Sequence, residues 1–98
     1  MSRVNIAGEL SIYQVAELKP QFQQALDQAN RDSQAIELEL SQMSECDGAG
    51  LQLLLSLGKS ANEFETAVHL INAPQTLLEM LSMYGLSNRF VALEEAHE

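Results

Sequence analysis

The chain has 98 residues, 46% of them hydrophobic, with 5 basic and 14 acidic residues and a formal net charge of −9. This length allows one compact domain with one core. The negative charge disfavours nucleic acid and anionic membrane partners by Coulomb repulsion and favours a basic protein surface. We find no leader-like segment and no apolar run long enough to span a bilayer. The single Cys46 cannot form an internal disulfide, so we expect a reducing, cytoplasmic setting.

Hydrophobic periodicity divides the chain into alternating strands and helices. The predicted strands are residues 3–7, 35–40 and 67–71. The predicted helices are residues 11–30, 48–64 and 74–84. Residues 8–11 are expected to form a turn, a short loop precedes Asp47, and residues 86–93 are expected to hold one more turn and a brief strand. This order predicts a single α/β domain over residues 1–93, with a mostly parallel sheet of about four strands and an acidic tail at 94–98.

The first helix has one capping residue and one breaker. Ser11 is expected to cap it, and Pro20 predicts either a regular helix that begins near Glu17 or a kink. Its apolar residues recur at helical spacing: Val15, Leu18, Phe22, Ala25, Leu26 and Ala29.

The predicted strands are apolar on one face and polar on the other. The apolar set is Val4, Ile6, Ile36, Leu38, Leu40, Val68 and Leu70. The polar set is Arg3, Asn5, Glu37, Glu39 and His69. Parallel strands covered on both faces would be apolar throughout, so we expect the helices mainly on one face of the sheet.

The second helix begins with an acidic cap and two glycines. Asp47 is placed to cap it. Its expected core side is Gly50, Leu53, Leu54, Leu57, Gly58, Ala61 and Phe64. Leu51 and Leu55 widen the apolar arc, so they are either covered by neighbouring elements or form a partly exposed ridge for a protein partner.

The third helix is expected to start at Pro74, to bury Leu77, Leu78, Leu81 and Tyr84, and to end at Gly85. Met80 and Met83 lie on its flank, where methionine either fills core gaps or forms an adaptable binding surface.

The sequence resembles the STAS domain family, named after sulfate transporters and anti-sigma-factor antagonists. The resemblance rests on Gly8-Glu9-Leu10-Ser11, on the strand before Leu40, on Asp47-Gly48-Ala49-Gly50-Leu51, and on Ala73-Pro74 to Tyr84-Gly85-Leu86. It implies a module that binds other proteins, docking through the loop around Asp47 and the start of the following helix.

The family signature is Asp-Ser-Ser/Thr-Gly-Leu, and the residue before its Gly is the hydroxyl that a partner kinase phosphorylates. Ala49 holds that position here, and neither it nor Gly48 can accept phosphate. A phosphate there would add about −1.5 to −2 charges beside Asp47. We therefore expect binding without this switch, or regulation at another residue such as the nearby Ser44.

The resemblance implies a non-enzymatic partner-binding protein of bacterial signalling. The implied contact residues are Ser44, Glu45, Asp47, Gly48, Ala49, Gly50, Leu51, Gln52 and Leu55. The implied partner is a regulatory protein, an anti-sigma factor/kinase or a chemotaxis histidine-kinase component, because the spacing around Leu10 and Asp47 is similar to small chemotaxis-associated STAS proteins. An accessory subunit that binds the ATPase of a lipid-transport complex is the alternative. A homodimer stays open.

Other reactive residues lack the patterns that chemistry needs. Cys46 lies beside a helix start but next to Asp47, which favours an inert thiol. Glu37 and Glu39 predict a solvated face, near Arg3 or His69. His69 and His97 have no metal-ligand spacing with Cys46, and Gly48-Ala49-Gly50 lacks the Lys-Ser/Thr of a phosphate loop. We expect no catalytic residues, metal or cofactor.

Overall fold

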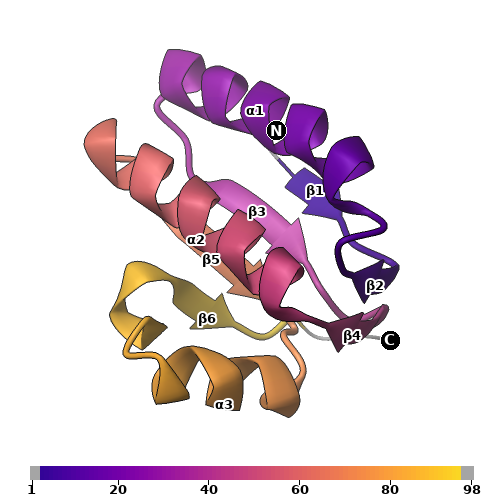
Figure 1. The fold of residues 1–98 in the computed structure, drawn as a ribbon. Coiled ribbons are helices and arrows are strands. Elements are labelled where there is room, and N and C mark those ends of the chain that lie inside the picture. The colour runs from indigo at the N-terminus through magenta and orange to yellow at the C-terminus, as the bar shows by residue number, and fades with distance from the viewer. Residues whose placement is uncertain (1–2, 96–98) are drawn as a thin grey trace.

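The computed structural model of the protein describes residues 3–95, which follow the predicted α/β order (Figure 1). The strands are β1 (Arg3–Asn5), β2 (Gly8–Leu10), β3 (Ile36–Glu39), β4 (Met43–Cys46), β5 (Val68–Ile71) and β6 (Val91–Leu93). The α-helices are α1 (Val15–Asp32), α2 (Gly48–Glu63) and α3 (Gln75–Met83), and a 3-10 turn covers Ser87–Arg89. The turn and brief strand predicted within residues 86–93 are therefore confirmed.

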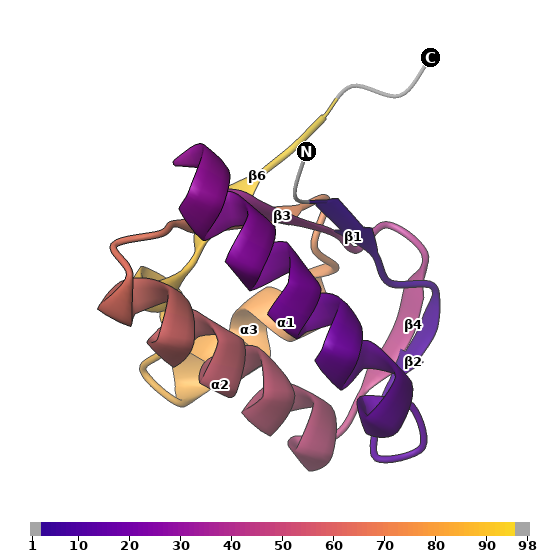
Figure 2. The same cartoon turned by 90° about the horizontal axis from the view of Figure 1, so that it is seen from above.

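The main sheet has four strands in the order β1-β3-β5-β6, and each neighbouring pair is parallel. Figure 2 shows the helices gathered on one side of this sheet. The predicted single α/β domain, with a parallel four-stranded sheet and helices on one face, is confirmed. Parallel strands joined by helices that stay on one side need successive crossovers of the same hand, which is the rule for such connections.

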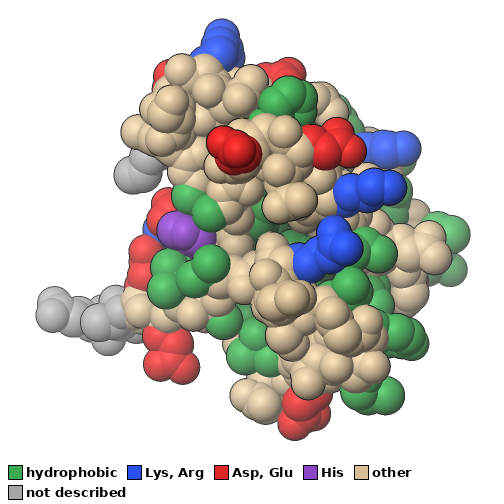
Figure 3. All heavy atoms as spheres, turned by 90° about the vertical axis from the view of Figure 1, so that its left-hand side faces the viewer, with side chains coloured by type: hydrophobic (Ala, Val, Ile, Leu, Met, Phe, Trp, Pro, Cys, Tyr) green, Lys and Arg blue, Asp and Glu red, His purple; other side chains and the backbone are tan. Residues whose placement is uncertain are grey.

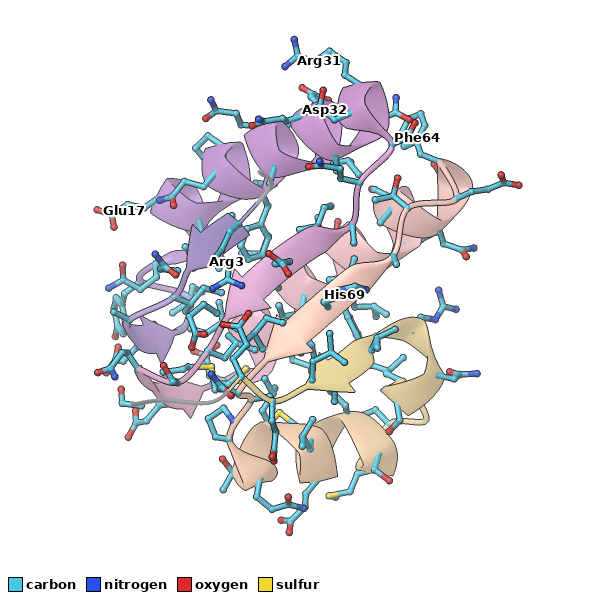
Figure 4. All side chains as sticks on the ribbon, turned by 180° about the vertical axis from the view of Figure 1, so that it is seen from behind. Arg3, Glu17, Arg31, Asp32, Phe64 and His69 are labelled. Carbon is cyan, nitrogen blue, oxygen red and sulfur yellow. The ribbon has the colours of Figure 1, made fainter. Side chains whose placement is uncertain are left out.

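The two faces of the sheet differ as the alternation predicted. The apolar set is buried against the helices: Val4, Ile6, Ile36, Leu38, Leu40, Val68 and Leu70. The opposite face carries Arg3, Glu37, Glu39 and His69, and Figure 4 shows Arg3 and His69 on it. At its far edge, the register places Val91 with His69.

A second sheet, made of β2 and β4, corrects the prediction at two places. Residues 8–11 were expected to turn the chain and the segment before Asp47 to be a loop, but the two segments pair as parallel strands. Leu10 and Met43 are buried and anchor the pair in the core. Three or four residues leave too little alternation to predict a strand, and the pairing forms between segments far apart in sequence.

Helix α1 also begins differently from the expectation. It starts at Val15, and its N-cap Gln14 makes no side-chain capping bond. The predicted cap by Ser11 is wrong, because Ser11 supports the turn before the helix: its carbonyl accepts from the amides of Gln14 and Val15. The helix begins two residues before the expected start near Glu17, after a turn over residues 11–14, and Pro20 lies within it.

Burial along the later helices decides between the two interpretations of Leu51 and Leu55 and corrects the prediction at Phe64 and Tyr84. Leu51 is only 8% exposed and Leu55 is partly buried, so Leu51 forms no exposed ridge. Phe64 and Tyr84, both expected to face the core, are 52% and 65% exposed. Each is the C-cap residue that follows its helix, where the chain leaves helical geometry and the periodicity no longer applies.

The chain after β6 is tied back to the first strand. The Glu95 carboxylate accepts two hydrogen bonds from the Arg3 guanidinium, the shorter at 2.6 Å, and its amide donates to the Asn72 side chain at 2.9 Å. Arg3 also pairs with Glu37 at 3.3 Å. The rest of the predicted acidic tail, residues 96–98, lies outside the described residues.

Candidate functional site

Asp47 joins the start of α2 to the turn that follows β2. One carboxylate oxygen, Oδ1, accepts from the Gly50 amide at 2.9 Å and thereby caps the helix as predicted. The other, Oδ2, accepts from the Ile12 amide at 3.2 Å. These two bonds hold the pKa of the Asp47 carboxyl below its ordinary value, so the group is charged at neutral pH. A single exposed side chain therefore fixes two segments that are far apart in sequence.

Gly50 allows α2 to lie directly against the end of β2. A Cβ atom at this position would stand 2.0 Å from the carbonyl oxygen of Leu10 and 2.7 Å from its carbonyl carbon, closer than any side chain can approach. The same Leu10 oxygen accepts from the Asp47 amide at 3.1 Å. Gly50 is thus required by its contact with backbone, which cannot move aside as a flexible side chain could.

The turn after β2 holds two apolar side chains in solvent. Ser11 is buried, its Oγ accepts from the Tyr13 amide at 3.3 Å, and it donates to the Glu9 carboxylate at 3.3 Å. Ile12 and Tyr13 are 65% and 82% exposed. Because the Ile12 amide is also bound by Asp47, both side chains project from a turn whose backbone is fixed. Large apolar groups presented on fixed backbone are typical of protein contact sites.

A hollow of about 400 Å³ lies beside this turn, between the small sheet and α3. Its carboxylates come from Glu9, Glu45 and Asp47. Helix α3 contributes Met80 to the opposite wall. None of the described residues that line the hollow is Lys or Arg. We call the five residues Glu9, Ile12, Tyr13, Glu45 and Asp47 the Asp47 surface; it is acidic and carries exposed apolar side chains at its edge.

The structure divides the predicted contact residues into three groups. The exposed ones are Ser44, Glu45, Asp47, Gly48 and Gln52; the partly buried ones are Ala49 and Leu55; the buried ones are Gly50 and Leu51. Ser44, Glu45 and Asp47 line the hollow together. Gly50 and Leu51 shape the surface from beneath and present no side chain to a partner.

Two positions bear on phosphorylation. Ala49 is the second residue of α2 and is partly buried, with a methyl group where the resemblance implies a hydroxyl. Ser44 is exposed on β4 and lines the hollow. Ser44 therefore precedes the helix cap Asp47 in sequence, whereas Ala49 follows it.

Cys46 has the environment of an inert thiol. It is partly buried, and its Sγ donates to the Asp47 carbonyl at 3.6 Å. Burial, and next the charge of Asp47, raise the pKa of the Cys46 thiol to about 11, so it is protonated at neutral pH.

The polar face of the sheet has its own hydrogen-bond network. Glu39 accepts from the Ser41 amide at 2.7 Å and from the Asn72 side chain at 3.3 Å. The bond from Ser41 is the main cause of a lowered pKa at Glu39. The expected proximity of Glu37 to Arg3 is confirmed by their ion pair. The Glu37 and Glu39 carboxylates are therefore occupied by hydrogen bonds and an ion pair within the protein, and the two do not form an acid-base pair for catalysis.

The structure of residues 3–95 shows neither a metal-binding cluster nor a membrane-spanning helix. No group of three or more His, Cys, Asp or Glu side chains in this part of the chain is arranged to hold a metal ion. Within the same residues, no helix combines the length and the apolar character that a bilayer crossing requires.

Sequence reasoning missed the turn that completes the surface. Glu9, Ile12 and Tyr13 were not predicted to meet Asp47, although the small sheet and the Asp47–Ile12 bond bring them together. A usable signal was present: within the predicted helix 11–30, Tyr13 falls on the side opposite the apolar stripe, so the predicted core has no place for its ring.

Comparisons with known proteins agree with this fold. The family model described as "Mlab, STAS domain" matches residues 1–94. One similar solved structure is the anti-sigma factor antagonist SpoIIAA in its unphosphorylated form, 17% identical, with a TM-score of 0.72 over 97% of this chain and 79% of that chain. Another, from Thermotoga maritima, is described as a candidate anti-sigma factor antagonist; it is 21% identical, with a TM-score of 0.74 over 97% of this chain and 80% of that chain.

The comparison with curated proteins found no match. At these identities the solved structures show a shared fold, and the family match covers nearly the whole sequence. The chain belongs to the STAS domain family.

Proposed function

We propose that this STAS domain is a non-enzymatic interaction module of bacterial signalling that binds a regulatory protein through the Asp47 surface. The observation that carries the proposal is the pair of exposed side chains, Ile12 and Tyr13, on a turn that Asp47 locks to the start of α2. A fixed apolar contact loses little conformational entropy on binding, and tyrosine is among the residues that contribute most to interfaces.

The charge of the Asp47 surface indicates the chemistry of the partner. Glu9, Glu45 and Asp47 line one hollow without a basic residue among its described lining, in a chain of net charge −9. A partner with lysine or arginine beside an apolar patch would complement both features. Such attraction mainly increases the rate of association, and it weakens as salt is added.

Binding is proposed to proceed without the usual serine or threonine switch. Ala49 has no hydroxyl at the position that the family phosphorylates, so the start of α2 keeps one charge state whatever kinase is present. Regulation would then act on the partner, or at Ser44 on β4, whose exposed hydroxyl lines the hollow.

The family fold supports a regulatory protein as the partner, because the two similar solved structures are described as anti-sigma factor antagonists. On this proposal the partner is an anti-sigma factor/kinase or a component of a chemotaxis histidine-kinase system, and the domain, residues 1–93, acts in the cytoplasm. An accessory subunit on the ATPase of a lipid-transport complex is the second candidate, since the matching family model is described by the name Mlab and not as an antagonist.

Site-specific photo-crosslinking in cells tests the proposal. Tyr13 is replaced by a photoreactive phenylalanine derivative, and Tyr84, equally aromatic and 65% exposed at the end of α3, is replaced in the control. We expect one crosslinked partner from position 13 and not from position 84. A kinase or anti-sigma factor supports signalling, an ATPase subunit supports the second candidate, and equal crosslinking from both positions contradicts docking at the Asp47 surface.

A further inference from the structure

A second hollow lies at the other end of α2 from Asp47. It measures about 550 Å³ and lies among the last turn of α2, the first residues of β5 and β6, and the turn after α3. Sites for small molecules commonly have volumes of this order. Gly58, the first α2 residue that lines it, lies eleven residues after Asp47, or about 16 Å along the helix at 1.5 Å per residue.

Each polar side chain that lines this hollow in the described part of the chain can donate hydrogen bonds, and none of them is a carboxylate. Asn62, Thr66, Asn88 and Arg89 line it, and no Asp or Glu does among the described residues. Within residues 3–95, the Arg89 guanidinium makes no ion pair or hydrogen bond to another side chain. A carboxylate-free hollow with a free guanidinium contrasts with a chain of net charge −9. We call it the Arg89 groove.

Lys59 is a second cation on α2, next in sequence to Gly58, which lines the Arg89 groove. It is exposed and stands three residues before Asn62 on α2, a spacing that places both on the same side of the helix. Figure 3 shows Lys and Arg side chains close together on this side of the molecule, with acidic side chains around them. This side of the molecule therefore carries cations within a chain of net charge −9.

Two helices end near the Arg89 groove, and a carbonyl group in the last turn of each accepts a backbone hydrogen bond from the chain that follows. The Ala61 carbonyl accepts from the Thr66 amide at 2.8 Å, and the Leu81 carbonyl accepts from the Leu86 amide at 2.8 Å. A helix C-terminus repels anions through unpaired carbonyl groups. Because the Ala61 and Leu81 carbonyls are paired in this way, these two groups repel an anion less than unpaired carbonyls would.

The Arg89 groove has an apolar wall as well. The Phe90 ring packs on the backbone of α2 at Gly58, where a Cβ atom would stand 3.1 Å from the ring carbon Cζ. Phe90 is buried, and the neighbouring Val91 is 45% exposed. Donors at one side and hydrocarbon at the other suit an anion that carries a small apolar group.

We propose that the Arg89 groove binds an organic phosphate monoester, with the phosphate on Arg89, Asn62 and Asn88 and the organic group against Phe90 and Val91. A phosphate offers three acceptor oxygens, which matches donors on separate walls better than the two oxygens of a carboxylate, and a guanidinium can bind two of them at once. This site is independent of the docking function and lies outside the Asp47 surface. The same headgroup chemistry occurs in soluble esters and in phosphatidic acid.

Titration of the isotope-labelled full chain with phenyl phosphate, followed by NMR, tests the site. We expect shifts at the side-chain amides of Asn62 and Asn88 and at the Arg89 Nε, with a Kd of about 1 mM, typical of a small ligand held by few contacts. Inorganic phosphate should bind several-fold more weakly. Arg89→Gln should weaken phenyl phosphate binding at least about tenfold, whereas the matched control Arg31→Gln, exposed on α1, should leave it unchanged.

Vesicles of phosphatidylcholine with and without phosphatidic acid distinguish the two sources. Sedimentation with phosphatidic acid that is lost in Arg89→Gln, without binding of phenyl phosphate, assigns a lipid headgroup; binding of phenyl phosphate alone assigns a soluble ester. The proposal is overturned if neither binds, if inorganic phosphate binds as tightly as the ester, or if Arg31→Gln and Arg89→Gln weaken binding equally.

Discussion

The two ends of α2 are built from similar parts and differ in charge and rigidity. A glycine makes a close contact toward each end: Gly50 meets the backbone of Leu10 in β2, and Gly58, five residues before the end of α2, meets the ring of Phe90, the residue before β6. Carboxylates gather at the first end, and the free guanidinium of Arg89 lies at the second. Helix α2 thus separates the acidic Asp47 surface, which is fixed by a backbone contact at Gly50, from the Arg89 groove, where the contact at Gly58 is with the Phe90 side chain.

This difference shows how a chain of net charge −9 can present two unlike surfaces. The charge of each end is set locally, by which side chains line it, and the total charge determines only the long-range field. The rigidity is also local. At Gly50 an added Cβ would meet backbone atoms of Leu10, which cannot move aside, whereas at Gly58 it would meet the Phe90 ring, which can tilt.

The largest expected effect is that of Gly50→Ala. Its methyl group would overlap the Leu10 carbonyl, so α2 must shift away from β2 and break the link through Asp47. We expect a loss of about 3 kcal/mol in the free energy of unfolding, the upper end of typical overpacking costs. Denaturant unfolding measures it. Gly48→Ala is the control, since nothing lies within 4 Å of a Cβ there and alanine favours the helix.

Gly58→Ala should cost less than Gly50→Ala, at about 1 kcal/mol, because the contact at 3.1 Å is with a ring that can tilt. The same denaturant unfolding experiment applies. Equal losses at the two glycines would contradict the contrast between a rigid and an adaptable end of α2.

Acidic pH is expected to have a smaller effect on stability, through the Asp47 carboxyl at the N-terminus of α2. The folded-state pKa of Asp47 is lowered, so its contribution to stability is present above the unfolded-state pKa of about 4 and is lost as the pH falls through the lower folded-state value. Asp47→Asn keeps a capping oxygen and removes the titration. The free energy of unfolding of Asp47→Asn should therefore change less over this acidic range than that of the parent chain. Equal pH dependence of unfolding in the two proteins would contradict the role of the Asp47 carboxylate.

The smallest expected effect is that of Glu45→Gln on partner binding. Glu45 is exposed at the side of the hollow, where a single charge contributes mainly to the rate of association. We expect an association rate lowered about twofold at low salt and little change in the dissociation rate. A large increase in the dissociation rate would instead place Glu45 in a buried contact.

Local sequence signals predicted those parts of the fold that depend on periodicity. The alternation around Leu38 gave the strand and its buried face, and the Asp47 cap was predicted from residue type and position. The strand at Leu10 could not be predicted, because its partner near Cys46 is distant in sequence and both segments are very short. The exposure of Tyr84 depends on where the helix ends, and helix ends are set by capping bonds that a periodic pattern does not encode.

The candidate site also has a part that the sequence predicts and a part that only the fold brings together. Asp47 and Glu45 follow from the segment itself, whereas Tyr13 enters the surface through the small sheet and the Ile12 amide bond. The burial of Leu51 depends on the elements that pack over α2. Periodicity shows which residues of a helix are apolar, but packing decides which of them remain available to a partner.

The affinity of the purified partner for two tyrosine variants tests the central claim most directly. We predict that Tyr13→Ala weakens binding about 30-fold, the equivalent of ~2 kcal/mol and typical of a tyrosine that contributes strongly to an interface, while the free energy of unfolding stays nearly unchanged. Tyr84→Ala, the exposed control on α3, should bind as the parent chain does. Unchanged affinity in Tyr13→Ala, or an equal loss in both variants, would contradict docking through the Asp47 surface.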